Sequence, residues 1–568
     1  MEPRRILLAV VLMAAVLFVT PILFPSAPAP TKTPIATITP SPAPSTAPAE
    51  APSTAAPAAA PAAGAAAMGA TPAAAAAAPP IAIDTTAITT PRAVYRTTNR
   101  GAALMGAQMT QYAALGARGR STSEPVELAT ATDPLLAFRL VIPGDTIRLD
   151  RTVFTTTRTE ADGKTVVRYD ATVASRMVAI TWSFLPDSYR VNVAAQVSAA
   201  PGTTTGTSGY LLVDLPPAFH SSEADTTEDQ SHLAYAYKQD KQGAKGIAFR
   251  SVDPGERELA TGPLTWAVAK NKYFLVGMLA PVGQPGFAEL NVTGGVRTGK
   301  QATRAQATAV LPLVDGRTAF EVYAGPQEFT RLVAMGREFE TSNPYGGWLQ
   351  GIVQPFATLV IRLLLWMKAS FHLSYGWILV LFGIAVRIIL WPLNQKAMRS
   401  SMAMQRLQPE MQAIQAKFKS DPQKQQAAMM QLYKEHGMSP FSSLSGCLPM
   451  LIPLPIFFAL FFVFQNTIEF RGVPFLWLPD ISVKDPYFVL PILVAVTALA
   501  LSWIGMKGVK ANEQQKMMMY LMPGMMLFLF FSMASGLNLY YLVQNLASIP
   551  QQWLIAQERG KQTPIIRG

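Results

Sequence analysis

Residues 375–393 read YGWILVLFGIAVRIILWPL, nineteen residues in which Arg387 is the only charged side chain. At 1.5 Å per helical residue, such a run is roughly 28 Å long, about the thickness of a bilayer core. The stretch therefore predicts a membrane-spanning helix. An arginine at bilayer depth costs roughly 2.5–3.5 kcal/mol, so Arg387 either reaches the interface near Pro392 or has a function at that depth.

Five further apolar segments lie around this one. They are residues 348–368, 446–468, 487–506, 517–535 and 537–556. The first differs from the others because Gln350, Gln354 and Arg362 are mixed into its apolar residues. That mixture is typical of a helix lying in the membrane interface, which we place at 345–370. The other four join 375–393 as a five-span core over 371–560.

Charge distribution gives the topology. Residues 393–446 carry seven Lys or Arg against three acidic residues, and basic loops stay in the cytoplasm. Residues 393–446 reach the cytoplasm only if segment 348–368 does not span the membrane, which agrees with its assignment as an interfacial helix. Loop 469–486 then falls outside, whereas loop 507–516 and a short tail, 561–568, fall inside.

The basic stretch 394–437 predicts a cytoplasmic helical hairpin. Apolar residues recur at helical spacing from Met404 to Phe418, and Asp421-Pro422 supplies the start of a second helix. Two interpretations stay open: a solvated helix pair that only obeys topology, or a docking surface for incoming chains or a ribosome.

The N-terminal residues 1–24 predict a sixth span. Arg4 and Arg5 precede an uncharged run from Ile6 to Phe24, which places the N-terminus in the cytoplasm. The alternative is a cleaved signal peptide, but the prolines that begin at Pro25 crowd the only candidate site. Residues 25–80 are mostly Ala, Pro, Thr and Ser and predict an extended periplasmic linker.

Residues 81–340 change to short runs rich in Val, Thr, Tyr and Phe. The clearest pair, 151–158 and 166–173, flanks Asp162-Gly163 and predicts a β-hairpin. Further strands are predicted at 177–184, 189–197, 210–215, 264–270 and 273–279. Repeated strands without intervening helices indicate an extracytoplasmic all-β sandwich.

Several function classes find no support in the sequence. The net charge of +12 is explained by topology, so no specific nucleic-acid partner is predicted. The four histidines lack metal-ligand spacing, and Cys447 is the only cysteine. We find no nucleophile–base pair and no phosphate-binding loop. We therefore predict no catalytic residue, no metal and no cofactor, and a protein that is not an enzyme.

Arg387 has no acidic residue in the other core spans to pair with. A proton or cation pathway needs carboxylates, whereas a lone cation suits transient acidic segments. The last span carries polar residues that would make a groove hydrophilic: Asn538, Tyr541, Gln544 and Asn545. Asn538, Tyr541 and Asn545 share one helix face. Ordinary hydrogen bonding between helices is the alternative for each.

Several motifs in order resemble the YidC/Oxa/Alb family of membrane protein insertases, in the form with a large periplasmic domain. They are FEVYAGPQEF, VRIILWPL, LYKEHGMSP, GCLPMLIPLPIFFALF and SGLNLYYLVQNLASIPQQWLI. The resemblance implies a β-supersandwich and a five-helix core around a hydrophilic groove. It places the groove arginine at Arg387 and substrate contacts at Leu454, Phe457 and Tyr541. Gly383 departs from the family, which often has a hydroxyl residue there.

The expected function follows from these features together. The sequence predicts a bacterial inner-membrane protein that integrates and helps fold other membrane proteins, with both termini cytoplasmic and the β domain periplasmic. The resemblance implies nascent membrane proteins, the Sec translocon with its accessory subunits, and membrane lipids as partners. The alternative is a transporter or channel with a periplasmic binding domain, which solute flux in proteoliposomes would reveal.

Overall fold

The computed structural model describes residues 82–561, with internal gaps at 143–144, 199–207, 285, 298, 300, 345–349, 419–420, 436–453 and 508–512. The predicted anchor 1–24 and linker 25–80 lie outside the described residues. The same holds for residues 446–453 of the second predicted core span and for the tail beyond Lys561. Ala82–Gly568 forms one compact unit.

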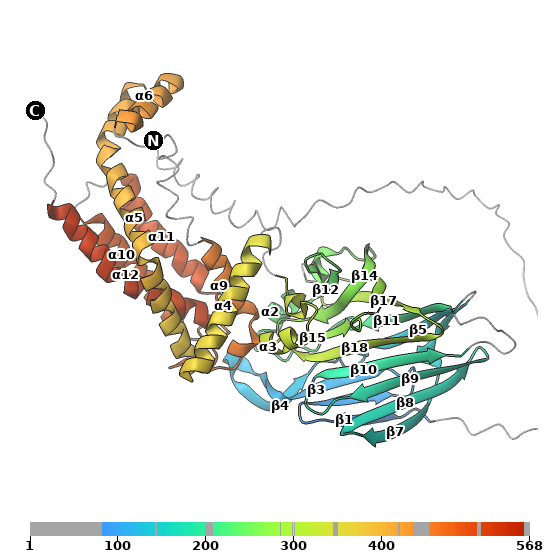
Figure 1. The fold of residues 1–568 in the computed structure, drawn as a ribbon. Helices are drawn as coiled ribbons and strands as arrows, with labels where there is room; N and C mark the ends of the chain where they lie inside the picture. The colour runs from blue at the N-terminus through green and yellow to red at the C-terminus, as the bar shows by residue number, and fades with distance from the viewer. Residues whose placement is uncertain are drawn as a thin grey trace, which may run out of the picture. The chain divides into compact units, whose positions relative to one another are not determined.

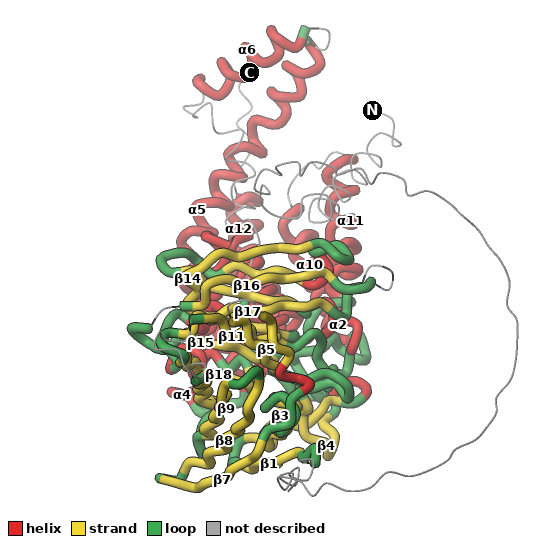
Figure 2. The backbone as a smooth tube through the Cα atoms, turned by 90° about the vertical axis from the view of Figure 1, so that its right-hand side faces the viewer, coloured by secondary structure: helices red, strands yellow, loops and turns green. Residues whose placement is uncertain are grey.

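The N-terminal part of this unit is built almost entirely of β-strands, in two antiparallel sheets (Figures 1 and 2). The smaller sheet has the order β1-β2-β3-β4: Thr85–Thr89, Ala93–Thr98, Leu104–Leu115 and Ser121–Glu127. The larger has the order β6-β5-β11-β17-β16-β14-β15-β18-β10-β9-β8-β7, with β12 and β13 added beside β14. Figure 2 shows β14, β16 and β17 side by side, as this order requires.

The strands of the larger sheet are β5 Ala137–Ile142, β6 Asp145–Arg148, β7 Thr155–Ala161, β8 Lys164–Val173, β9 Arg176–Phe184, β10 Arg190–Val197, β11 Gly209–Leu215, β12 Ala234–Gln239, β13 Lys245–Ala248, β14 Arg257–Lys270, β15 Phe274–Leu279, β16 Phe287–Gly294, β17 Ala305–Leu313 and β18 Arg317–Pro326. Strand β10 shows why they form, because every second residue from Val191 to Val197 is buried.

The predicted hairpin is present as β7 and β8. Ala161 pairs with Lys164, and the two residues between them, Asp162 and Gly163, both have positive φ. This is the backbone that two-residue hairpin loops prefer. The first strand begins at Thr155 rather than Arg151, because Leu149–Arg151 form a 3-10 turn.

The two sheets pack face to face around one hydrophobic core. Buried aromatic residues join them: the rings of Tyr95 and Phe184 have centroids 5.1 Å apart. The Tyr169 hydroxyl donates to Thr97 Oγ1 at 2.7 Å, which satisfies a buried polar group.

The C-terminal part is helical (Figure 1). Its long helices are α4 Gln350–Phe371, α5 Tyr375–Lys417, α6 Pro422–Glu435, α9 Leu454–Asn466, α10 Val489–Met506, α11 Glu513–Phe530 and α12 Ser535–Lys561; the short α2 Thr226–Ser231 and α3 Phe329–Ala334 precede them. Helix α5 is continuous for 43 residues, from the predicted span 375–393 into the first part of the predicted hairpin 394–437. Near residue 393 the side chains of α5 change from apolar to polar, but the backbone stays helical.

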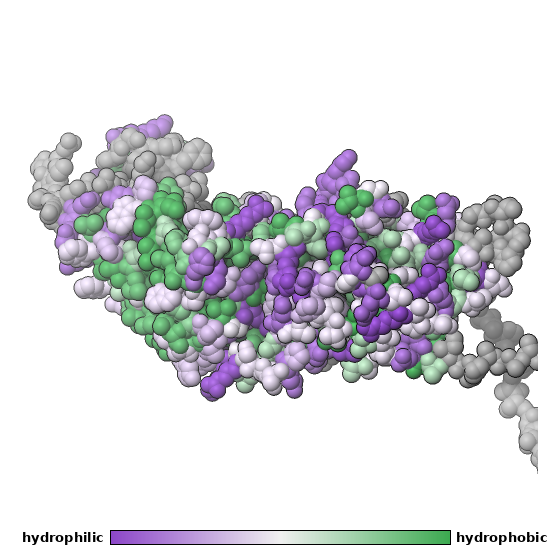
Figure 3. Space-filling model, turned by 60° about the horizontal axis from the view of Figure 1, so that its bottom comes forward, coloured by the Kyte–Doolittle hydropathy of each residue, from purple (hydrophilic) through white to green (hydrophobic). Residues whose placement is uncertain are grey.

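On the face that Figure 3 shows, hydrophobic residues gather over this helical part, whereas hydrophilic residues are more frequent over the β domain. Ile389 on α5 is 71% exposed and Trp503 on α10 is 63% exposed. Two described segments are long and apolar enough to cross a membrane, Tyr375–Gln395 and Val489–Met506, and two shorter apolar helices accompany them.

The loop between α9 and α10 contacts the β domain. Arg471, directly after the 3-10 turn Ile468–Phe470, forms an ion pair with Glu223 at 2.8 Å, and their side chains are only 4% and 6% exposed. The Arg471 guanidinium also donates to the carbonyl of Ala113 at 2.9 Å. We call this contact the seam.

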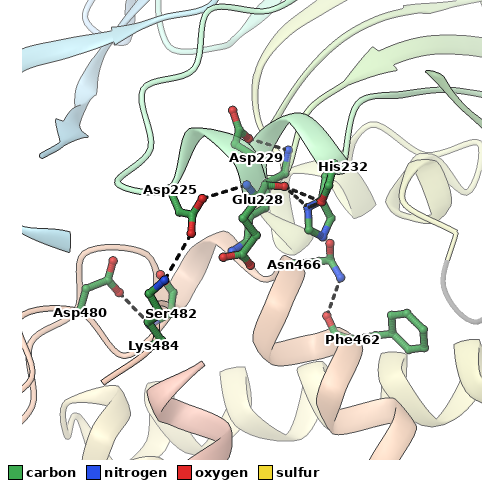
Figure 4. A network of polar contacts seen from close by, with 11 residues as sticks. Asp225, Glu228, Asp229, His232, Phe462, Asn466, Asp480, Ser482 and Lys484 are labelled. Atoms are coloured by element: carbon green, nitrogen blue, oxygen red, sulfur yellow. Dashed lines mark hydrogen bonds and ion pairs between the residues drawn. The ribbon is translucent and has the colours of Figure 1, made fainter. Parts of the chain in front are cut away.

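Two features border the seam. Lys484 approaches Asp225, which caps α2, at 3.6 Å across it (Figure 4). The Glu469 carboxylate accepts from the backbone N–H of Phe329 at 3.0 Å. Burial raises the pKa of both Glu223 and Glu469 to about 7.

Candidate functional site

Arg387 lies on α5 and is half-buried. Its side chain lines a pocket of about 330 Å³ between α5, α10 and α12. The other lining residues are uncharged: Asn394, Leu501, Ser502, Ser548 and Gln552. The helices thus bring one cation together with hydroxyl and amide groups, which can hydrogen-bond a ligand without neutralising the charge.

The partner of Arg387 is an amide. Its Nη2 atom donates to Gln551 Oε1 on α12 at 2.6 Å. Tyr540 of α12 also interacts electrostatically with it, and no ion pair among the described residues includes Arg387. The buried Nε atom of Arg387 has no hydrogen-bond partner among the residues that the structure describes. The site therefore keeps its positive charge, and such a charge acts strongly where the dielectric is low.

The other polar residues of α12 hold helices together. Gln544 donates to the carbonyl of Gly383 on α5 at 2.8 Å. Asn545 donates to the Thr497 hydroxyl on α10 at 3.1 Å. Asn538 is fully buried and donates to carbonyls at and beyond the end of α11, including Phe530 at 3.2 Å. None of the three lines the pocket of Arg387 as described.

The predicted substrate contacts fall partly within an aromatic cluster. Phe457 on α9 and Tyr541 on α12 have ring centroids 5.8 Å apart, and Phe530 of α11 lies 5.0 Å from Tyr541. The structure thus brings together two residues that are far apart in sequence. Leu454 begins α9, but its side chain lies outside the described residues.

Gly383 lets α12 approach α5 closely. A Cβ atom at this position would lie 2.9 Å from Val543 Cγ1, closer than side chains pack. Glycine in place of the family's hydroxyl residue therefore permits a close contact between α5 and α12. The backbone carbonyl of Gly383 accepts a hydrogen bond from Gln544.

Sequence analysis missed Gln551. It stands in the quoted motif SGLNLYYLVQNLASIPQQWLI, yet only Gln544 of that motif's glutamines was selected. A usable signal was present, because an amide within an apolar run at membrane depth needs a polar partner. That signal marks Gln551 as a candidate but does not identify its partner. Arg387 lies 164 residues away in sequence, so no local pattern could reveal the pairing.

The fold and site define a membrane protein with a β domain and a cationic pocket in its helical core. Two family models match the chain: "60Kd inner membrane protein" over residues 366–562 and "YidC periplasmic domain" over residues 85–359. The membrane protein insertase YidC of Chlorobium phaeovibrioides is 32% identical over 414 residues, 68% of each chain. The YidC of Anaeromyxobacter dehalogenans is 33% identical over 380 residues, 66% of each chain.

The chain therefore belongs to the YidC family of membrane protein insertases, which confirms the resemblance of its motifs. The β domain matches the periplasmic domain of that family, and the helical part matches its inner-membrane protein model. The chain spans about two thirds of the length of the curated relatives it matches.

Among solved structures, the chain is similar to "Active YidC insertase crystal structure with the first transmembrane domain resolved". Identity is 20%, coverage is 83% of this chain and 92% of that chain, and the TM-score is 0.33.

Proposed function

We propose that this chain integrates and helps fold membrane proteins in the bacterial inner membrane. The observation that carries the proposal is the half-buried Arg387, which lines a pocket and has an amide rather than a carboxylate as its partner. A membrane helix that retains such a charge bears its insertion cost. The charge is retained at that cost because it attracts acidic segments of a nascent protein.

The mechanism needs no energy-rich cofactor. A hydrophilic segment of the nascent protein enters from the cytoplasm, and Arg387 attracts its acidic residues. The hydrophobic segment moves into lipid along α9 and α11, passing Leu454 and Phe457 of α9 and Tyr541 of the neighbouring α12. Its apolar burial supplies the driving force. Asn538, Gln544 and Asn545 keep α12 in register with its neighbours.

The proposed topology has six spans, namely the anchor 1–24 and the five core spans, with both termini cytoplasmic. The distribution of Lys and Arg supports it, as does the apolar surface of α5 and α10. Helix α4 lies in the interface, with Leu359 and Trp366 exposed on one side and Val353 and Leu364 buried on the other.

The proposed partners are nascent membrane proteins, the Sec translocon with its accessory subunits, and membrane lipids. The end of α5 together with α6 is the candidate surface for a ribosome. The Tyr433 hydroxyl lies 4.0 Å from the Met411 sulfur and links these two helices, so the surface has a defined shape.

Arg387→Ala tests the proposal. Purified variants in proteoliposomes insert single-span substrates whose translocated segments are either acidic or neutral. A charged hydrogen bond is worth about 1.5–3 kcal/mol, so insertion of the acidic substrate should fall roughly tenfold or more. The neutral substrate should change little.

Arg362→Ala is the matched control, because Arg362 is another helix arginine and lies on α4 against the Phe329 ring. It should leave both substrates unaffected. If Arg387→Ala supports the acidic substrate as well as the unaltered protein does, the proposed role of Arg387 is wrong. Crosslinking from Phe457 and Tyr541 to a nascent chain tests the path.

A further inference from the structure

Gln551 is fully buried and makes three hydrogen bonds with groups of α5. Its Oε1 accepts from Arg387 Nη2 at 2.6 Å. Its Nε2 donates to the carbonyl oxygen of Trp391 at 3.3 Å and to Gln395 Oε1 at 3.1 Å. One side chain of α12 therefore bridges three consecutive turns of α5.

The neighbours of Gln551 fix which way its amide points. A backbone carbonyl oxygen such as that of Trp391 only accepts hydrogen bonds, so the amide nitrogen must face it. The amide oxygen must then face Arg387, whose guanidinium only donates. Rotation of the amide by 180° would break the bonds to both groups, so the arrangement holds the guanidinium in one orientation.

An amide at this place differs from a carboxylate in one decisive respect. Both offer an oxygen that accepts from the guanidinium, but a carboxylate would also neutralise it. Glutamine thus gives orientation without charge compensation. The polar residues that line the pocket beside Arg387, namely Asn394, Ser502, Ser548 and Gln552, are likewise uncharged.

We propose that Gln551 is a positioning residue that orients the Arg387 guanidinium and leaves its charge free, so that selection of acidic segments depends on an amide at position 551. This inference rests on the proposed function of the pocket. Gln551 acts through Arg387 and need not touch the substrate.

Gln551→Glu tests the inference, because it retains an acceptor of the same length and adds a negative charge. The assay measures the insertion rates of acidic and neutral substrates in proteoliposomes and takes their ratio. The ratio should fall roughly tenfold, since a compensated charge no longer attracts acids. Insertion of the neutral substrate should persist, which a purely structural role would not produce. The melting temperature should fall somewhat, because the carboxylate has no N–H to donate to Trp391 and Gln395.

Gln557→Glu is the matched control, because Gln557 is an exposed residue of the same helix. It adds the same charge outside the pocket and should leave the ratio unchanged. Should Gln551→Glu not fold, Gln551→Met removes the acceptor without adding charge, and the ratio should again fall while neutral insertion persists. Gln551→Asn, which is shorter but retains the amide, should recover part of it.

Two results would overturn the inference. One is an unchanged ratio in Gln551→Glu, and the other is an equal loss for acidic and neutral substrates, which indicates a role in folding alone. The parallel Arg387→Ala experiment separates this failure from failure of the proposed function. If Arg387→Ala lowers the ratio and folded Gln551→Glu does not, only the role of Gln551 is wrong. If neither lowers it, the pocket does not select acidic segments.

Discussion

Two arginines of this molecule are removed from bulk water in opposite ways. Arg471, in the seam between the β domain and the α9–α10 loop, is 4% exposed and forms an ion pair with Glu223. Arg387, in the helical core, is half-buried and bonds to the neutral Gln551. A charge with a buried countercharge is fixed in the structure. A charge with an amide partner is held in place but remains available to a ligand.

Removing each charge should therefore have different consequences. Arg471→Met leaves Glu223 buried without its partner and should lower the free energy of unfolding by about 3–5 kcal/mol. Arg387→Met removes a costly charge and leaves one amide oxygen unsatisfied, two effects of similar size. Its effect should stay within about 1 kcal/mol. Thermal unfolding of the purified protein in detergent measures both.

The controls for this pair come from the same seam. Arg471→Met combined with Glu223→Gln removes both charges and should be less destabilising than Arg471→Met alone. Lys484→Ala breaks the exposed ion pair with Asp225 and should cost less than about 1 kcal/mol. Equal losses at Arg387 and Arg471 would contradict the distinction between them.

The seam should also respond to pH. Burial raises the pKa of Glu223 from 4.5 to about 7, although Arg471 opposes the shift. Between these pH values the folded protein binds a proton that the unfolded chain has released. The contribution of this group to stability is therefore fully present below about pH 4.5 and is lost as the pH rises to about 7, by up to about 3 kcal/mol.

Glu223→Gln should flatten the pH dependence of the melting temperature between pH 4.5 and 7. Asp229 and Lys272 also act on Glu223, and Glu469 has its own raised pKa. A smaller slope should therefore persist in the variant. A slope identical to that of the unaltered protein would show that Glu223 does not titrate in this range.

The helical core depends more on close packing than on charge. Gly383→Ser places a Cβ atom 2.9 Å from Val543 Cγ1 and should cost about 1–3 kcal/mol. Adding Val543→Ala should recover part of the loss. Gly524→Ser on α11 is the matched control, because among the described residues no atom outside its own stretch of helix lies within 4 Å of the added Cβ. Melting temperatures compare the variants, and a neutral Gly383→Ser would show that α5 and α12 move apart easily.

Local patterns predicted the elements well. Short runs rich in Val and Thr and the Asp162-Gly163 turn placed β7 and β8, and apolar runs placed α10, α11 and α12 to within a few residues at their starts. The continuity of α5 across the boundary between the predicted span and the predicted hairpin was not among the predictions. Composition says which solvent a helix meets, and backbone hydrogen bonds decide where it ends.

The sequence by itself determined the division into β domain and apolar helices and the presence of a lone cation in a core span. These are properties of residue type and spacing along the chain. Only the tertiary structure decided that Gln551 holds Arg387 across 164 residues and that Glu223 neutralises Arg471 across 248. Hydrogen bonds and ion pairs act over a few ångströms in space, and a linear sequence does not record which distant groups come within that range.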